Sequence, residues 1–112
     1  MPCDLTHKKC KPCEGGVDPL KKEVAKDLLK QTIGWTISED GKSISQRFEF
    51  KGFYKVMGFI NALAWIANTE GHHPDVKYGY NYCEVLFTTH AIDGLSENDF
   101  ICASKIDALL NQ

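Results

Sequence analysis

The period of the hydrophobic pattern alternates along the chain between helical and strand spacing. Helical spacing holds over three segments, at about 20–31, 53–68 and 97–110. Strand spacing holds over four shorter runs, at 35–38, 43–50, 76–80 and 83–89. Turn residues join these runs in two pairs, and no helix separates the members of a pair, so the sheet should be antiparallel. This order predicts an α+β fold, α-β-β-α-β-β-α, with the helices on one face of the sheet.

Length and charge narrow the kind of protein further. The 112 residues, 43% of them apolar, suit one domain. Residues 1–16 are polar and end in a Gly-Gly pair, so we expect a flexible tail there and the domain over 17–112. A net charge of −2 argues against nucleic acid as a primary partner. The longest run without polar residues or glycine, 62–67, is far shorter than the ~20 residues of a membrane span.

Cysteines are unusually frequent for a chain of this size. There are five of them, at Cys3, Cys10, Cys13, Cys83 and Cys102. Their odd number and the lack of an apolar signal segment in 1–16 indicate a reducing compartment, so we expect the protein in the cytoplasm. The Cys-x-x-Cys pair at Cys10 and Cys13, with Cys3 and His7 nearby, is typical either of a small zinc site or of a polar tail with reduced thiols. We favour the tail, because no second pair exists, and expect Cys83 and Cys102 in the core.

Three histidines are the candidates for chemistry. His72 and His73 lie in the loop after the central helical segment, and His90 follows a later strand. We expect them to meet at one rim of the sheet, where they could be structural, bind a metal, or act as acid and base without one. Neighbouring side chains in an extended chain point apart, which disfavours a metal site and favours two sides of a flat substrate. An aromatic wall for such a ring could come from Trp35, Tyr78, Tyr80 and Tyr82.

The motifs around these histidines resemble those of a known family. Gly-His-His-Pro-Asp at 71–75 is followed by Tyr-Asn at 80–81, Thr-His at 89–90 and Gly-Leu-Ser-x-x-Asp at 94–99. Over about 34–109 the chain resembles the pterin-4a-carbinolamine dehydratases, and Cys-x-x-Cys followed by Gly-Gly is similar to the N-terminal segment of many bacterial members. The resemblance implies a four-stranded antiparallel sheet with three helices. It also implies an oligomer, either a homodimer or a homotetramer.

The resemblance implies an activity as well. Family members dehydrate 4a-hydroxytetrahydrobiopterin to quinonoid dihydropterin, the recycling step after an aromatic amino acid hydroxylase, without a metal or organic cofactor. The family's three catalytic histidines fall on His72, His73 and His90. Of these we expect His72 and His90 to transfer protons and His73 to hold the pterin.

Three further residues are implied as substrate-binding. The family's pterin-contacting acid falls on Asp99. Asn68 stands where the animal enzymes carry an acidic residue, and the nearby Glu70 could replace it.

Two other functions remain open from the sequence. Animal members of the family also serve as a dimerisation cofactor of a transcription factor, and a histidine cluster could instead belong to a zinc-dependent lyase or hydrolase. Because residues 1–16 are predicted to lie outside the core, their deletion should leave activity within a few-fold of the whole chain.

Overall fold

The computed structural model describes residues 5–11 and 18–110, and its order of elements is the predicted one. The helices are α1 (Lys22–Leu29), α2 (Phe53–Glu70) and α3 (Glu97–Leu110), with two short 3₁₀ turns, η1 (Leu5–His7) and η2 (His90–Ile92). The strands are β1 (Thr36–Ile37), β2 (Ile44–Glu49), β3 (Asp75–Tyr78) and β4 (Tyr82–Phe87). They form one antiparallel sheet in the order β1-β2-β4-β3. This confirms the α+β fold.

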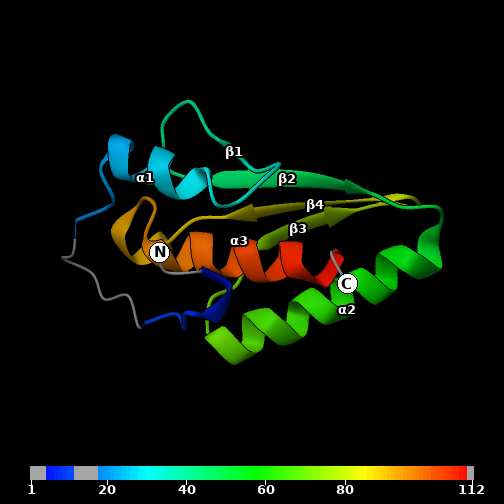
Figure 1. Ribbon diagram of the computed structural model, residues 1–112. Helices are drawn as coiled ribbons and strands as arrows, with labels where there is room; N and C mark the ends of the chain where they lie inside the picture. The colour runs from blue at the N-terminus through cyan, green and yellow to red at the C-terminus, as the bar shows by residue number, and fades with distance from the viewer. Residues whose placement is uncertain (1–4, 12–17, 111–112) are drawn as a thin grey trace.

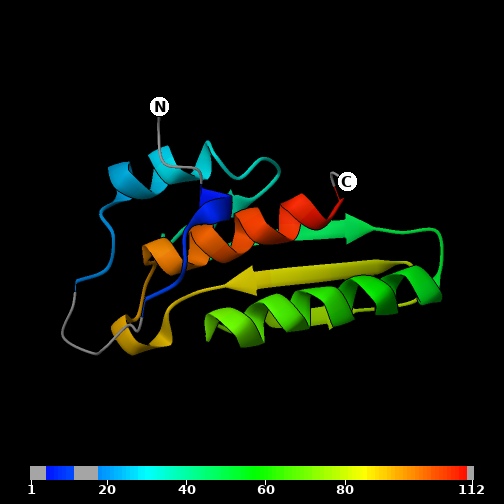
Figure 2. The ribbon, with the colours of Figure 1, turned by 60° about the horizontal axis from the view of Figure 1, so that its bottom comes forward.

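The helices cover one face of the sheet. Figures 1 and 2 show α2 and α3 side by side across that face, and α1 packs against α3. The core between the layers comes from alternate residues of β2 and β4 and from the inner sides of the two long helices; it includes Ile44, Phe48, Val85, Phe87, Val56, Phe59, Leu63, Phe100 and Ile106. Cys83 and Cys102 are also fully buried, as predicted. None of the helices in the described residues has the length and apolar character that crossing a membrane requires.

The first helix begins later than the sequence suggests. An Asp-Pro pair at 18–19 is a typical helix start, but α1 begins at Lys22, and Lys21 caps it without a side-chain hydrogen bond. The backbone N–H of Leu20 instead donates to the Leu95 carbonyl at 2.8 Å. This long-range bond holds the segment extended against the loop before α3, so the helix starts after it.

Residues 5–11 differ most from the expectation; we call them the strap. Leu5 is buried in the core, and η1 packs on α3, so this part of the predicted tail belongs to the folded domain. The Lys105 ammonium donates to the Thr6 carbonyl at 2.8 Å, and Lys8 pairs with Glu97 at 2.7 Å. Figure 2 shows the strap, in dark blue, lying across α3. An isolated Leu in a polar segment has no periodicity, which is why the pattern missed it. Cys3, Cys13 and the Gly-Gly pair lie outside the described residues.

Trp35 is a buried anchor of this core. Its indole N–H donates to the Asp107 carboxylate at 2.9 Å, and burial raises the pKa of that carboxyl above its ordinary 3.8. The native state therefore binds this proton more tightly than the unfolded chain. The contribution of Asp107 to the free energy of unfolding is largest below pH 3.8 and is lost as the pH rises through the raised pKa.

We expect Asp107→Ala to leave the indole N–H unpaired and to lower the free energy of unfolding by about 1–3 kcal/mol at neutral pH. Asp107→Asn keeps an acceptor and should cost less, while removing the pH-dependent contribution. Urea denaturation of the three proteins at several pH values measures both effects. If Asp107→Ala and Asp107→Asn lowered the free energy of unfolding equally, the hydrogen bond from the Trp35 indole would contribute nothing to stability.

Candidate active site

The three predicted histidines surround one cavity. It has a volume of about 490 Å³. Its lining includes residues at the end of α2 and the start of η2, two elements that lie at the same end of the sheet (Figure 2). Its lining includes His72, His73 and His90, together with Glu70, Asn98, Thr88, Thr89, Cys10 and Lys11. A slightly larger hollow of about 540 Å³ lies over strand residues and holds no histidine. The first cavity is therefore the candidate active site.

A sharp helix end places the first two histidines. Gly71 adopts a left-handed conformation with φ of +67°, which favours glycine. Its N–H donates to the Asn68 carbonyl and that of His72 to the Ala67 carbonyl, so the last turn of α2 closes on itself. His72 is thus turned inward at once, while His73 stays exposed at the cavity.

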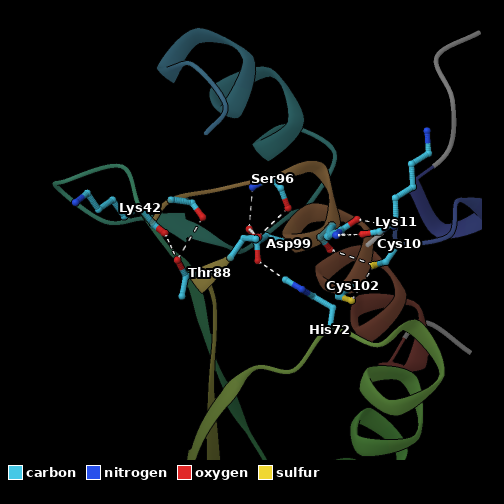
Figure 3. Close-up of polar contacts among 11 residues, drawn as sticks. Cys10, Lys11, Lys42, His72, Thr88, Ser96, Asp99 and Cys102 are labelled. Carbon is cyan, nitrogen blue, oxygen red and sulfur yellow. Dashed lines mark hydrogen bonds and ion pairs between the residues drawn. The ribbon is translucent and has the colours of Figure 1, made fainter. Parts of the chain in front are cut away.

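His72 is held by a buried acid. Its Nε2 lies 2.6 Å from Oδ1 of Asp99, whose side chain is 0% exposed (Figure 3). The His72 ring also stacks on Phe87. The other carboxylate oxygen accepts from the Thr89 hydroxyl at 2.8 Å and from the Ser96 backbone N–H at 3.0 Å. Two donors on one oxygen favour the charged form of a carboxylate, and a charged carboxylate can only accept, so in this arrangement the 2.6 Å bond runs from the Nε2–H of His72 to Asp99. In the neutral ring Nδ1 is then the basic nitrogen.

The sequence pattern found part of this arrangement. Within the Gly-Leu-Ser-x-x-Asp motif, Ser96 and Asp99 make half of a helix capping box, because the Asp99 carboxylate accepts the Ser96 N–H. Asp99 was expected to contact a substrate, whereas the structure places it behind His72 and outside the cavity lining.

His90 stands on a short closed loop. Thr89 and Gly94 pair across its base, with N···O distances of 2.9 and 3.4 Å, and Asp93 takes a left-handed conformation between them. His90 is exposed, so its ring is accessible from the cavity and from solvent. His73 and His90 are thus the two exposed histidines of the cavity, whereas His72 is largely buried and bonded to Asp99.

Two of the other predicted residues have different surroundings from those expected. Glu70 lines the cavity, but its Oε1 accepts the Cys10 N–H at 2.8 Å, and Lys105 lies 3.8 Å from its other oxygen. Asn68 is exposed and is not part of the lining. Asn98, which reasoning from the sequence missed, is buried beside the cavity.

The predicted aromatic wall is wrong. β3 runs away from His73, so the β3–β4 turn with its tyrosines lies at the opposite end of the sheet (Figure 1). Trp35 is in the core and contacts Phe48 and Phe87. Among the described residues no three His, Cys, Asp or Glu side chains are grouped closely enough to hold a metal ion.

Comparison with known proteins decides the family. The family model described as Pterin 4 alpha carbinolamine dehydratase matches residues 18–109. The chain belongs to this family. A relative from Nitrosomonas eutropha with the provisional name pterin-4-alpha-carbinolamine dehydratase is 59% identical over 109 residues, which cover 96% of this chain and 95% of that protein. A relative of the same provisional name from Legionella pneumophila is 54% identical over 111 residues, 98% of each chain.

Solved structures agree with this family. A crystal structure described as a transcriptional coactivator/pterin dehydratase from Brucella melitensis superposes with a TM-score of 0.78 at 29% identity, over 82% of this chain and 98% of that one. A pterin dehydratase-like protein described as a RuBisCO assembly factor of the alpha-carboxysome has a TM-score of 0.59 at 23% identity, over 68% of this chain and 88% of that one, a likeness of fold alone.

Proposed function

We propose that this member of the dehydratase family converts 4a-hydroxytetrahydrobiopterin to quinonoid dihydropterin and water by histidine acid–base catalysis. The observation that carries the proposal is the meeting of three histidines at one cavity, with one of them bonded to a buried carboxylate. Two proton transfers are needed, because the C4a hydroxyl must be protonated to leave as water and the N5 proton must be removed.

The geometry supports a role for each histidine in this scheme. Nδ1 of His72 is the basic nitrogen and would take the N5 proton, while the Asp99 carboxylate stabilises the positive charge that the ring gains. His90, which is exposed, would protonate the departing hydroxyl, and His73 would hold the pterin ring. A positioned general acid or base contributes ~10²–10⁴-fold, so two such groups supply a large part of a catalysed rate.

The deciding experiment is a stopped-flow assay with freshly generated carbinolamine. Wild-type protein should accelerate the appearance of quinonoid dihydropterin over the spontaneous reaction in proportion to enzyme concentration. No acceleration at micromolar enzyme would refute the proposed activity. The natural setting that we propose is the recycling of tetrahydrobiopterin in the cytoplasm, where the substrate is supplied by an aromatic amino acid hydroxylase.

We expect activity to survive exhaustive treatment with a chelator. The adjacent histidines lie on different sides of the loop, since His72 turns inward to Asp99 and His73 is exposed, which does not suit shared ligation of one ion. Activity of chelated and untreated protein, with metal content by elemental analysis, makes the comparison. Loss on chelation and recovery with zinc would support the zinc-dependent alternative.

We also propose that the chain is a homodimer or homotetramer, with the outer side of α2 as its contact. Tyr54 and Trp65 are 92% and 74% exposed there, and the smaller Gly58 and Ala62 lie between them at helical spacing. A second copy of the same helix would cover both aromatic rings. Light scattering at micromolar concentration should give a multiple of 12.6 kDa. Trp65→Glu should shift the mass toward the monomer and Trp65→Phe should not; a wild-type monomer would contradict the proposal.

A further inference from the structure

The strap carries an inference that rests on the proposed function and extends it. We propose that residues 10 and 11 form one wall of the active site, and that Asn98 is the positioning residue that holds this wall in place. Cys10 and Lys11 both line the cavity that contains the three histidines. They lie more than 60 residues before the three histidines in the sequence. Their position at the cavity therefore depends on contacts between distant parts of the chain.

The side-chain amide of Asn98 makes two hydrogen bonds with the backbone of the strap. Its Oδ1 accepts the Lys11 N–H at 3.0 Å, and its Nδ2 donates to the Lys11 carbonyl at 2.6 Å. This pair of bonds recognises a backbone in the way that a neighbouring strand does, independently of the lysine side chain. Asn98 is 7% exposed with the strap in place, so both hydrogen bonds are shielded from water.

A second set of contacts fixes the preceding residue. The Cys10 N–H donates to Glu70 at the end of α2, and the Cys10 sulfur lies 3.5 Å from that of Cys102 on α3. Figure 3 shows Cys10 and Lys11 beside Cys102, next to the His72–Asp99 pair. The strap thus joins the two helix ends that carry His72 and Asp99. Glu70 was expected to bind substrate, but one of its carboxylate oxygens accepts the Cys10 N–H and so helps to hold the strap.

The alignments with two relatives extend farther toward the N-terminus than the family model does. The family model starts at residue 18 and leaves the strap out, but the alignments with the Nitrosomonas eutropha and Legionella pneumophila proteins span 96% and 98% of this chain. Both alignments therefore extend beyond the family model toward the N-terminal end of the chain, where the strap lies. A wall built outside the common family core is a place where substrate preference can be set without altering the histidines.

The expected effect is on substrate binding. A wall contacts substrate and transition state alike, so its loss raises KM and leaves kcat nearly unchanged. We expect Asn98→Ala to raise KM about tenfold, with kcat within about threefold of wild type. Ser104→Ala, which removes a contact of Thr6 at the far end of the strap, is the matched control and should leave both constants unchanged.

Whether the strap is docked can be measured without an enzyme assay. The hydrogen bond with Cys10 and burial raise the pKa of the Cys102 thiol, so it should react slowly with iodoacetamide while the strap is in place. Alkylation of Cys102, mapped by peptide mass, should become faster in Asn98→Ala and not in Ser104→Ala. Unchanged alkylation in Asn98→Ala would show that this side chain does not hold the strap.

A truncation completes the test. In a chain lacking residues 1–11, KM should rise at least as much as in Asn98→Ala, and adding Asn98→Ala to the truncation should have no further effect. A further rise would mean that Asn98 touches the substrate directly, which overturns the positioning role. Since the truncation also removes Leu5 from the core, its fold is checked by circular dichroism; if it does not fold, Asn98→Ala decides alone.

The outcomes separate the two proposals. If wild-type protein does not dehydrate carbinolamine, the proposed function fails, and the alkylation result still reports on the strap. If wild-type is active and Asn98→Ala has wild-type KM despite fast alkylation of Cys102, the strap is not a wall of the site and the inference is wrong.

Discussion

Replacing His72 or His90 with Ala should lower kcat/KM for carbinolamine by ~10²-fold or more, because each removes one of the two proton transfers. Each loss corresponds to about 2.7 kcal/mol of transition-state stabilisation. The double replacement should cost less than the sum of the two, since both groups act on one transition state. His73→Ala should instead raise KM with a smaller change in kcat.

Stopped-flow kinetics of the four variants, with circular dichroism as a check on folding, measures these effects. His73→Ala is the natural comparison for His90→Ala, because both histidines line the same cavity and both are exposed. If His90→Ala turned over carbinolamine at the wild-type rate, the proton donor would have to be sought in His73 or in a bound water.

Asp99→Asn should lower kcat/KM by ~10–10²-fold while largely preserving the fold. The amide has nearly the shape of the carboxylate, but with its nitrogen toward His72 it would donate to Nε2, which moves the ring proton to Nδ1 and removes the base. If its oxygen faced His72 instead, the nitrogen would meet the Thr89 and Ser96 donors, which is unfavourable. The substitution therefore either changes the tautomer of His72 or breaks the hydrogen bonds that Thr89 and Ser96 donate to residue 99.

Asp99→Ala should cost stability as well as activity. It leaves the Ser96 N–H without its acceptor, while the Thr89 hydroxyl keeps the Ser96 hydroxyl as a partner, so the expected loss is about 1–3 kcal/mol. Urea denaturation and stopped-flow rates of the Ala and Asn variants separate the two roles. A fully active Asp99→Asn would show that Asp99 is only structural and that the tautomer of His72 is not set by it.

The order of elements and the meeting of the histidines were both predictable, because they depend on local patterns. Helical and alternating periodicity marks α2 and β4, and antiparallel pairing then brings the end of α2 close to the end of β4. The same reasoning failed for the tyrosines, since it did not follow the direction of β3 away from the site. Element ends were also missed where a distant bond decides them, as at Leu20 and Leu95.

Contacts between the two ends of the chain were beyond sequence reasoning. Asn98 and Lys11 are 87 residues apart, and neither residue type in its own surroundings indicates the other. Asp99 was singled out from its motif, but the choice between contacting the substrate and holding His72 depends on burial, which the motif does not specify. Deleting residues 1–16 should therefore be more damaging than the polar composition suggests.

The exposure of the two tryptophans has a practical consequence for spectroscopy. Trp35 is 4% exposed and bonded to a carboxylate in the core, whereas Trp65 is 74% exposed on the outer side of α2. In the isolated chain, indole emission should thus have two components, a blue one from Trp35 and a red one, quenched by iodide, from Trp65. Dilution across a self-association equilibrium should move only the second component, and denaturant should move the first. One fluorescence titration can therefore separate dissociation of the copies from unfolding of the core.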